Sequence, residues 1–512
     1  MTGASSTRPA PSSRGKGRRG ARRHAARAGF ATMPLAACLA GFAGPAVFVP
    51  QVAMAATPGN WQSLGTTPST MTPVVFETPS HDAYVLWTKG LGPNSFTYDV
   101  AEVSPMGDLL AGPTSIFGPH YWGSLSVQPT IVGQGGAPLV VFDGARSTSP
   151  ADPYSKSCIV GALGPGLPWA LQPWSLSASC VNPVGAASVD NSGQLSAAWP
   201  GGWPTGHGIL YHMGQSPGIP AASPDQHIAL GGPAVAGHVA MATDRAGNGH
   251  TYVAWAQTGS SGAAQDGYYA KDLTANGPVV RVPGSGSRSA NISPFAVPAM
   301  ANSLSHPGVF VAYCSNAPSC NVELWKLGSA KALTVPGSSG AADTAVSAGP
   351  DGRIWVAWYN ESKNTVSLVR TNKSVTLFGP VTTLATPCAE HGLIGLGPGQ
   401  WGRSDIALQC VDQQLKIEDL FTQAIVPLAL GPSHVTVVAG KAKQVVFRVT
   451  DAGDPVAGAT VKVGTHLART NAGGTVTVTF SKTSTPGSYS VTASGPNYRP
   501  ATGVVVVSEP AH

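Results

Sequence analysis

The feature that most constrains the fold is a segment that recurs about every fifty residues through the middle of the chain. Each copy has a short apolar strand, a turn rich in Asp, Asn, Gly or Pro, and a second strand that ends on a large apolar residue, aromatic in all but the weakest copy. Copies end at Trp87, Phe142, Trp199, Trp255, Tyr313, Trp358 and Leu408. Successive ends are separated by 45 to 58 residues, which is the regularity expected of an internal repeat.

A unit of this length is too short to bury a core alone, but it accommodates four strands and their turns. No ten-residue stretch has a convincing helical period, so the fold class is all-β. Repeated four-stranded units predict a β-propeller over residues 57–425. We expect seven blades, with six or eight as alternatives, and one blade completed by strands from both ends of the chain. The tryptophans that end four copies should fill the space between blades.

The repeats resemble those of bacterial sialidase-like (BNR/Asp-box-like) propellers, in which an Asp-x-x-Gly turn joins two strands of each blade. The turns at Asp190–Gly193 and Asp244–Gly247 carry this resemblance, and Asp351–Gly352 is a shorter Asp-Gly turn at the same place in the repeat. A strict Ser-x-Asp-x-Gly-x-x-Trp motif is absent. A fainter resemblance to bacterial propeller lectins rests on Trp61-Gln62-Ser63-Leu64, Trp122-Gly123-Ser124-Leu125 and Trp174-Ser175-Leu176. These three segments are expected just before the first strand of successive blades.

Residues 426–512 have a different sequence pattern, in which Val and Thr alternate along several short runs. A period of two with one buried face predicts antiparallel strands, and about seven strands in this length fit a β-sandwich. The segments 451–461, 470–475 and 486–489 resemble bacterial Ig-like domains of exported proteins. This resemblance implies a spacer or adhesive module without catalytic chemistry.

The N-terminal segment accounts for the positive charge of the chain, which is +6 over 512 residues. Residues 1–55 hold eight basic residues and no acidic one, so the remainder carries 22 basic and 24 acidic residues. A basic start, an apolar stretch and the small residues near Ala55–Ala56 predict a cleaved signal peptide over residues 1–56. The protein is therefore expected to be secreted or displayed at the cell surface.

Two alternatives for this segment stay open. A retained membrane anchor conflicts with three prolines and three glycines in the apolar stretch. A lipoprotein acylated at Cys38 fits Leu35-Ala36-Ala37-Cys38, but the apolar run continues past the cysteine. The general and twin-arginine export pathways are not distinguished.

The low density of charge in the rest of the chain limits the classes of partner that it can bind. Only 11% of residues are charged, and no basic patch is left to attract nucleic acid. No phosphate-binding loop, dinucleotide fingerprint or His-Glu-x-x-His motif is present, so no cofactor is expected. We expect a monomer without a stable membrane span, whose partner is a glycan or a cell-surface polymer.

Six cysteines remain after the predicted cleavage, an even number that indicates disulfides in an exported protein. They are Cys158, Cys180, Cys314, Cys320, Cys388 and Cys410. Fifteen pairings are possible, and pairing in sequence order is the simplest. Because no Cys-x-x-Cys pair or adjacent histidine cluster occurs, no metal site is expected.

Catalytic chemistry is weakly represented. A sialidase mechanism needs three arginines around a carboxylate, but residues 56–425 contain only seven arginines and no Phe/Tyr-Arg-Ile-Pro segment. A glycosidase needs only two carboxylates about 5–10 Å apart, and Glu77, Glu361 and Glu390 are possible members. The sequence therefore identifies no catalytic residues, and it favours a non-catalytic protein over an enzyme.

A glycan-binding surface is the first hypothesis for function. Neutral sugars are held by aromatic faces with a few amide, hydroxyl and carboxylate partners. Aromatic and histidine residues flanked by Gly and Pro predict such contacts in loops; they are Tyr121, Trp122, Trp203, His207 and Trp401. His212 is expected at the surface or in a loop. The alternative is a secreted sialidase-like glycoside hydrolase.

Overall fold

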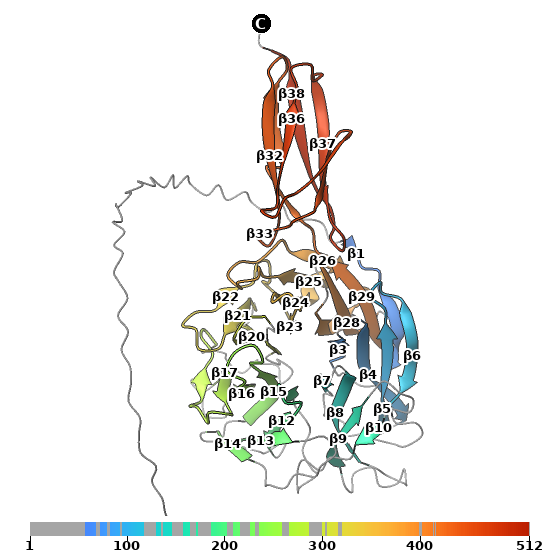
Figure 1. Ribbon diagram of the computed structural model, residues 1–512. Coiled ribbons are helices and arrows are strands. Elements are labelled where there is room, and N and C mark those ends of the chain that lie inside the picture. Colours follow the sequence, from blue (N-terminus) through green and yellow to red (C-terminus); the bar gives the residue numbers. More distant parts are fainter. Residues whose placement is uncertain are drawn as a thin grey trace, which may run out of the picture. The chain divides into compact units, whose positions relative to one another are not determined.

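We analysed a computed structural model of the chain (Figure 1). The structure describes residues 57–67, 72–78, 82–92, 95–116, 130–134, 137–145, 157–163, 170–172, 186–201, 208–215, 226–230, 235–258, 266–285, 299–302, 305–315, 320–398, 402–412, 414 and 416–510. Contacts divide the chain into residues 1–53 and residues 54–512. The predicted signal peptide, residues 1–56, lies outside the described residues.

Four-stranded antiparallel sheets follow one another along the first part of this unit. Sheet 1 contains β3 (Val74–Glu77), β4 (Ala83–Gly92), β5 (Ser95–Val103) and β6 (Leu109–Ser115). Sheet 2 contains β7 (Thr130–Gln134), β8 (Ala137–Ala145), β9 (Ser157–Leu163) and β10 (Ala170–Gln172). Sheet 3 contains β11 (Ala186–Val189), β12 (Leu195–Gly201), β13 (Gly208–Gln215) and β14 (Gln226–Ala229).

The next three sheets repeat this order. Sheet 4 contains β15 (Val235–Thr243), β16 (Thr251–Thr258), β17 (Gly267–Asp272) and β18 (Val280–Arg281). Sheet 5 contains β19 (Ala299–Asn302), β20 (Val309–Cys314), β21 (Val322–Lys326) and β22 (Leu333–Thr334). Sheet 6 contains β23 (Asp343–Ala348), β24 (Ile354–Asn360), β25 (Thr365–Arg370) and β26 (Thr382–Ala385), with the short 3-10 helix η1 (Glu361–Lys363) between β24 and β25.

Sheet 7 combines strands that are far apart in the sequence. It contains β27 (Glu390–Gly397), β28 (Arg403–Val411), β29 (Ile417–Ile425) and, outermost, β2 (Gln62–Thr67). The register pairs Gln62 with Phe421. Just before β2, the two-residue strand β1 (Thr57–Pro58) adds to sheet 6 in parallel with β26. The prediction that one sheet is completed from both ends of the chain is therefore confirmed.

The first strands of the sheets contact one another in a closed circuit. β3 contacts β7, and the contacts continue through β11, β15, β19, β23 and β27 back to β3. Every predicted copy of the repeat ends on the second strand of a different sheet, from β4 in sheet 1 to β28 in sheet 7. The four-stranded repeat is thus confirmed, and the described sheets are consistent with propeller blades.

Large aromatic side chains fill the space between sheets, as the repeat predicts. Trp87, Trp199, Trp255 and Trp358 are all buried. Trp358 of sheet 6, for example, packs in one cluster with Phe310 and other apolar residues of sheet 5. Small and branched side chains such as Ala and Val occupy the rest of the second strands, because both faces of these strands are covered.

Two details differ from the sequence-based expectations. Trp61 precedes β2, the outer strand of sheet 7, and not the first strand of a sheet; its indole N–H donates to the carbonyl oxygen of Ala385 at 2.7 Å. His212, expected at the surface or in a loop, lies on β13 and is buried. Both differences arise from packing between sheets, which the local sequence does not reveal.

The last described segment forms two further sheets around one core. The strands are β30 (Ala429–Gly431), β31 (His434–Val438), β32 (Lys443–Asp451), β33 (Asp454–Pro455), β34 (Thr460–Val463), β35 (His466–Arg469), β36 (Thr475–Phe480), β37 (Gly487–Ser494) and β38 (Ala501–Ser508). β30, β32, β33 and β36 form one sheet, and the order β31-β38-β37-β34-β35 forms the other. Valines and Phe447 from both sheets share a single apolar cluster. Across the described residues, no helix has the length and apolar character needed to span a membrane.

Candidate functional site

The antiparallel strand order gives each sheet two distinct ends. Connections from the first to the second strand and from the third to the fourth lie at one end, which we call the turn end. Connections from the second to the third strand, and from the fourth strand to the next sheet, lie at the other end, which we call the link end. The two ends carry different polar groups, and these groups decide where a ligand can bind.

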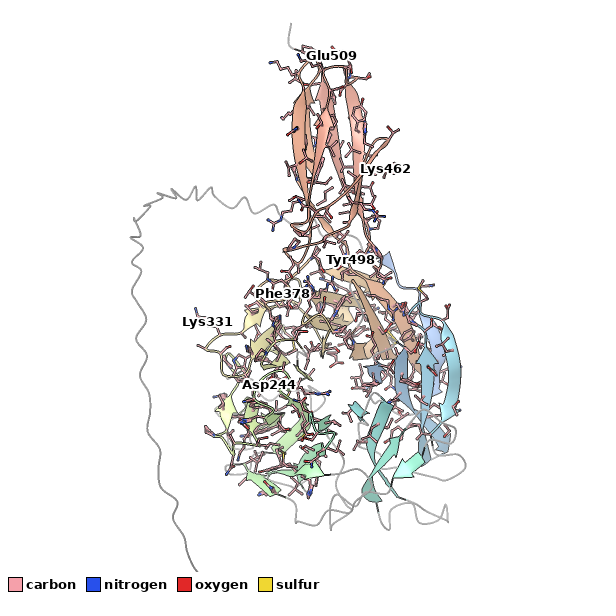
Figure 2. All side chains as sticks on the ribbon, viewed as in Figure 1. Asp244, Lys331, Phe378, Lys462, Tyr498 and Glu509 are labelled. Atoms are coloured by element: carbon pink, nitrogen blue, oxygen red, sulfur yellow. A yellow bond between two sulfur atoms is a disulfide. The ribbon has the colours of Figure 1, made fainter. Side chains whose placement is uncertain are left out.

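Aspartates at the turn end hold turns and join neighbouring sheets. The Asp190 carboxylate accepts backbone N–H groups of Ser192 and Gln194 at 2.8 and 2.9 Å. Asp244, labelled in Figure 2, lies in sheet 4. It accepts the backbone N–H of Gly308 in sheet 5 at 2.9 Å. These short side chains satisfy turn amides, which is the usual role of Asp in such turns. The Asp-box-like turns therefore act as structural contacts.

The link end of sheets 5 to 7 is stabilised by two disulfides. Cys314–Cys320 closes the connection between β20 and β21, and Cys388–Cys410 ties the residues before β27 to β28. Both agree with pairing in sequence order. Cys180 lies outside the described residues, as does the side chain of Cys158, so their pairing stays a prediction.

Intact mass spectrometry tests the complete pairing. We expect residues 57–512, which hold six cysteines, to show no free thiol before reduction and six thiols after it, because pairing in sequence order uses every cysteine. Alkylation with and without reductant gives the count, and peptide mapping gives the partners. Free thiols on Cys158 and Cys180 in the unreduced protein would contradict the third pair.

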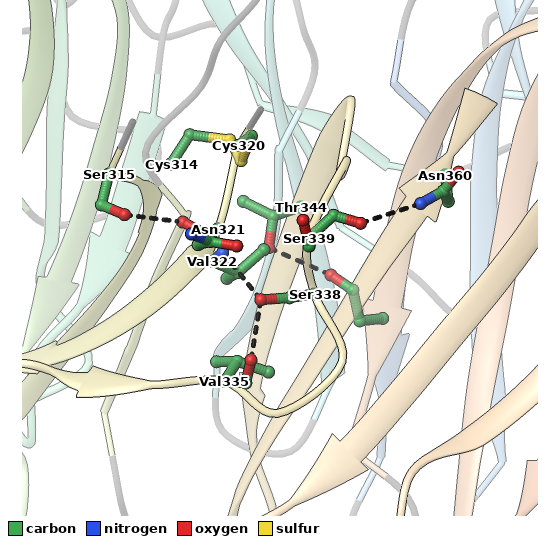
Figure 3. Close-up of a disulfide and its surroundings, with 11 residues drawn as sticks. Cys314, Ser315, Cys320, Asn321, Val322, Val335, Ser338, Ser339, Thr344 and Asn360 are labelled. Atoms are coloured by element: carbon green, nitrogen blue, oxygen red, sulfur yellow. Dashed lines mark hydrogen bonds between the residues drawn. A yellow bond between two sulfur atoms is a disulfide. The ribbon is translucent and has the colours of Figure 1, made fainter. Parts of the chain in front are cut away.

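Hydrogen bonds at the link end fix the connections around the first disulfide (Figure 3). The Ser338 hydroxyl donates to the Val335 carbonyl at 2.8 Å and accepts the Val322 N–H at 2.9 Å. The Asn360 amide donates to the Ser339 carbonyl at 3.1 Å, while its oxygen accepts the Lys363 N–H at the start of η1. These buried amide and hydroxyl groups thus constrain the connections at the link end.

Asp343 places a carboxyl group at this end, at the start of the first strand of sheet 6. Its Oδ2 accepts the backbone N–H of Ile394, in the first strand of sheet 7, at 2.8 Å. Burial raises the pKa of Asp343 to about 7, although the backbone N–H groups of Ile394 and Thr344 oppose this rise. Near neutral pH the group is therefore present in both forms, and it can donate or accept a hydrogen bond.

A pair of carboxyl groups, Glu77 and Asp405, lies at the turn end between sheets 1 and 7. Burial raises the pKa of Glu77 to about 8, with a further increase from nearby Asp405 and a decrease from Arg403. Asp405 is fully buried, accepts Arg403 Nη2 at 3.3 Å and accepts Gln423 Nε2 at 2.8 Å. Because these partners occupy Asp405 between two sheets, a sugar ring has no access to it.

The described arginines of the seven sheets are engaged in structural contacts. Arg245 Nε donates to Asn191 at 3.2 Å, and Arg281 donates to the Asp266 carbonyl at 2.6 Å. Arg403 contacts Asp405, while Arg353 and Arg370 bind the Asp451 carboxylate on β32. Arg146 and Arg288 lie outside the described residues. These contacts leave the five described arginines poorly suited to the three-arginine site of a sialidase.

Some of the other site residues predicted from the sequence lie outside the described part of the chain, and others lie within it. Tyr121, Trp122, Trp203, His207 and Trp401 all lie outside the described residues. Glu361 and Glu390 are exposed, and Glu77 is partly buried. The sequence analysis did not identify Asp343, Asp405 or Arg403, because nothing in their local sequence shows that another sheet buries them.

No metal centre stands out in the part of the chain that the structure describes, where no three His, Cys, Asp or Glu side chains are grouped as ligands. No protein-family model and no curated protein matches the chain in sequence. Among solved structures, it is similar to a Dyadobacter fermentans protein of unknown function, with 10% identity, 72% of this chain and 100% of that chain covered, and a TM-score of 0.41.

Two further similarities involve proteins whose ligands are known. A Penicillium chrysogenum α-L-arabinanase complexed with arabinobiose shares 12% identity over 72% of this chain and 98% of its own, with a TM-score of 0.38. The Aleuria aurantia lectin in complex with α-methyl-L-fucoside shares 12% identity over 58% of this chain and 94% of its own, with a TM-score of 0.35.

Proposed function

We propose that this chain is an exported seven-bladed β-propeller, with a C-terminal Ig-like sandwich, that binds a neutral glycan at its link end. The observation that carries the proposal is the contrast between the two ends in sheets 5 to 7. Asp343 at the link end binds the Ile394 N–H through Oδ2 but remains partly exposed, at the end where buried amides and hydroxyls constrain the connections. At the turn end, Asp405 is fully buried and binds Arg403 and Gln423 within sheet 7, and Arg353 binds Asp451 of β32.

The chemistry of sugar binding fits the link end. Glycan hydroxyl groups need donors and acceptors held in fixed positions, and a surface constrained before binding loses less entropy when the ligand arrives. Two disulfides and the cap of η1 by Asn360 provide this constraint. A carboxyl group that titrates near neutrality serves either as donor or as acceptor.

The aromatic partners are proposed from connectivity. In sequence, Tyr121 and Trp122 fall between β6 and β7, and Trp203 and His207 fall between β12 and β13. These are connections of the link-end type. Trp401 falls between β27 and β28, a connection of the turn-end type, so it is not expected to contact the glycan.

A glycan array followed by titration tests the proposal. We expect Trp122→Ala and Trp203→Ala each to weaken binding of the best array ligand at least tenfold, because each removes an aromatic face, an effect of about 1.4 kcal/mol. Asp343→Asn should weaken it at neutral pH, and Trp401→Ala serves as the matched control with unchanged affinity. No array binding, together with turnover of an aryl glycoside, would favour the hydrolase instead.

A further inference from the structure

The seam between sheets 1 and 7, where the circuit of sheets closes, is built differently from a purely apolar contact. Glycines on β27 allow β3 to approach at backbone distance. A Cβ added to Gly395 would lie 2.1 Å from the Pro73 carbonyl oxygen, and one added to Gly397 would lie 2.5 Å from Val75 Cγ1. The two strands are therefore held close together, which limits the access of water to polar groups between them.

A polar cluster lies at the turn end of this seam. Asp405 on β28 accepts hydrogen bonds from Arg403 and Gln423 within sheet 7. The Gln423 Nε2 group also donates to the Ser104 carbonyl of sheet 1 at 3.4 Å. Glu77, the last residue of β3, adds its carboxyl group beside Asp405. The cluster thus holds two carboxyl groups and one guanidinium group across the seam.

We propose that this cluster is a pH-sensitive latch, in which a proton held by Glu77 keeps sheets 1 and 7 together and loss of that proton loosens the seam. A neutral Glu77 leaves one carboxylate to pair with Arg403. An ionised Glu77 places a second negative charge next to Asp405 in a poorly hydrated site, which is unfavourable.

The neighbouring charges agree with this assignment. β3 packs against β4, β7, β27 and β28. The titratable residues on these strands and on the turn before β4 are Asp82, Tyr84, Lys89, Glu390, His391, Arg403 and Asp405. Of these, Asp405 raises the pKa of Glu77 and Arg403 lowers it, and burial contributes more than either. Burial also raises the pKa of Asp405, which Arg403 and Gln423 oppose.

The direction of the pH effect follows from linkage. Glu77 has a pKa of about 8 in the closed seam against 4.5 as its ordinary value, so the closed form binds the proton more tightly. Closure is then strongest below about pH 4.5, and it weakens as the pH rises toward 8 by up to about tenfold per pH unit. Above pH 8 both forms are ionised and the dependence ends.

Hydrogen exchange of the intact protein measures this directly. Amide exchange rates in β3 and β27 are measured at pH 5 and pH 7 and compared with those in β37 (Gly487–Ser494). Because β37 contains no carboxylate, this comparison corrects for the intrinsic pH dependence of amide exchange. We expect the ratio of seam to reference opening to rise by tens of fold from pH 5 to pH 7. In Glu77→Gln, which is neutral at this position at every pH, the ratio should rise much less steeply than in the wild type, because only Asp405 is left to titrate.

Two outcomes would overturn the latch. One is a wild-type ratio that does not change between pH 5 and pH 7, a result that needs no variant. The other is a Glu77→Gln ratio that rises as steeply as the wild type. Glu361→Gln, which neutralises an exposed carboxylate on η1, is the matched control and should keep the wild-type slope.

Discussion

Replacing Arg370 by Met is expected to lower the free energy of unfolding by about 3–5 kcal/mol, because it breaks a buried ion network. Arg370 is the last residue of β25 in sheet 6 and is almost fully buried. Its guanidinium binds both carboxylate oxygens of Asp451 and donates to the Tyr498 hydroxyl at 2.8 Å. The same group lies 5.1 Å from the Trp355 ring and 5.3 Å from the Tyr498 ring.

The residues that bind Arg370 belong to the C-terminal strands: Asp451 is on β32, and Tyr498 lies between β37 and β38. Arg353 also contacts Asp451 at 3.4 Å and Asp454 at 2.7 Å. Burial lowers the pKa of Arg370 to about 10, against the raising effects of Tyr498 and Asp351. Removing one partner therefore leaves buried charges without the balance that makes their burial tolerable.

Urea unfolding measures the loss of stability, and limited proteolysis measures its location. We expect faster cleavage in the connection between β29 and β31, residues 426–433, because the network holds sheet 6 to the strands that follow. Arg448→Met, which removes an exposed arginine from β32, should change neither result. Equal stability of Arg370→Met and Arg448→Met would show that the network contributes little.

The repeated sheets were predictable from the sequence because their signals are local. A turn residue such as Asp244 and an aromatic residue such as Trp255 lie within the same fifteen residues, so the pattern is visible without the fold. The same holds for the alternating Val and Thr of β36. Strand pairing across hundreds of residues left no such pattern, so β2 was not recognised as the outer strand of sheet 7.

The polar residues were harder to predict because their properties depend on remote partners. Asp343 acquires its raised pKa from burial at the contact with Ile394, and Glu77 from burial between sheets 1 and 7. Arg353 directly precedes β24 in a short turn, yet its carboxylate partners include Asp451 and Asp454, about a hundred residues later. Local sequence shows that a group can titrate, but only packing shows how strongly its charge is disfavoured.

The second large effect is expected from Trp358→Ala, which should destabilise the protein by about 3–5 kcal/mol. Trp358 ends the sixth copy of the repeat and is among the largest fully buried side chains. It packs with Phe310 and Leu324 of sheet 5 and with Val356 and Val369 of sheet 6. Truncation leaves a cavity between two sheets whose backbones are fixed by their own hydrogen bonds, so neither sheet can move to fill it.

Denaturant unfolding of Trp358→Ala, Trp358→Phe and Met106→Ala separates cavity formation from a general effect of substitution. Phe retains an aromatic ring in the gap, so Trp358→Phe should lose clearly less stability than Trp358→Ala. Met106 is exposed in the turn before β6, and its truncation should stay within about 0.5 kcal/mol of the wild type. If Trp358→Ala is as stable as Met106→Ala, the aromatic ends of the repeat do not support the packing of adjacent sheets.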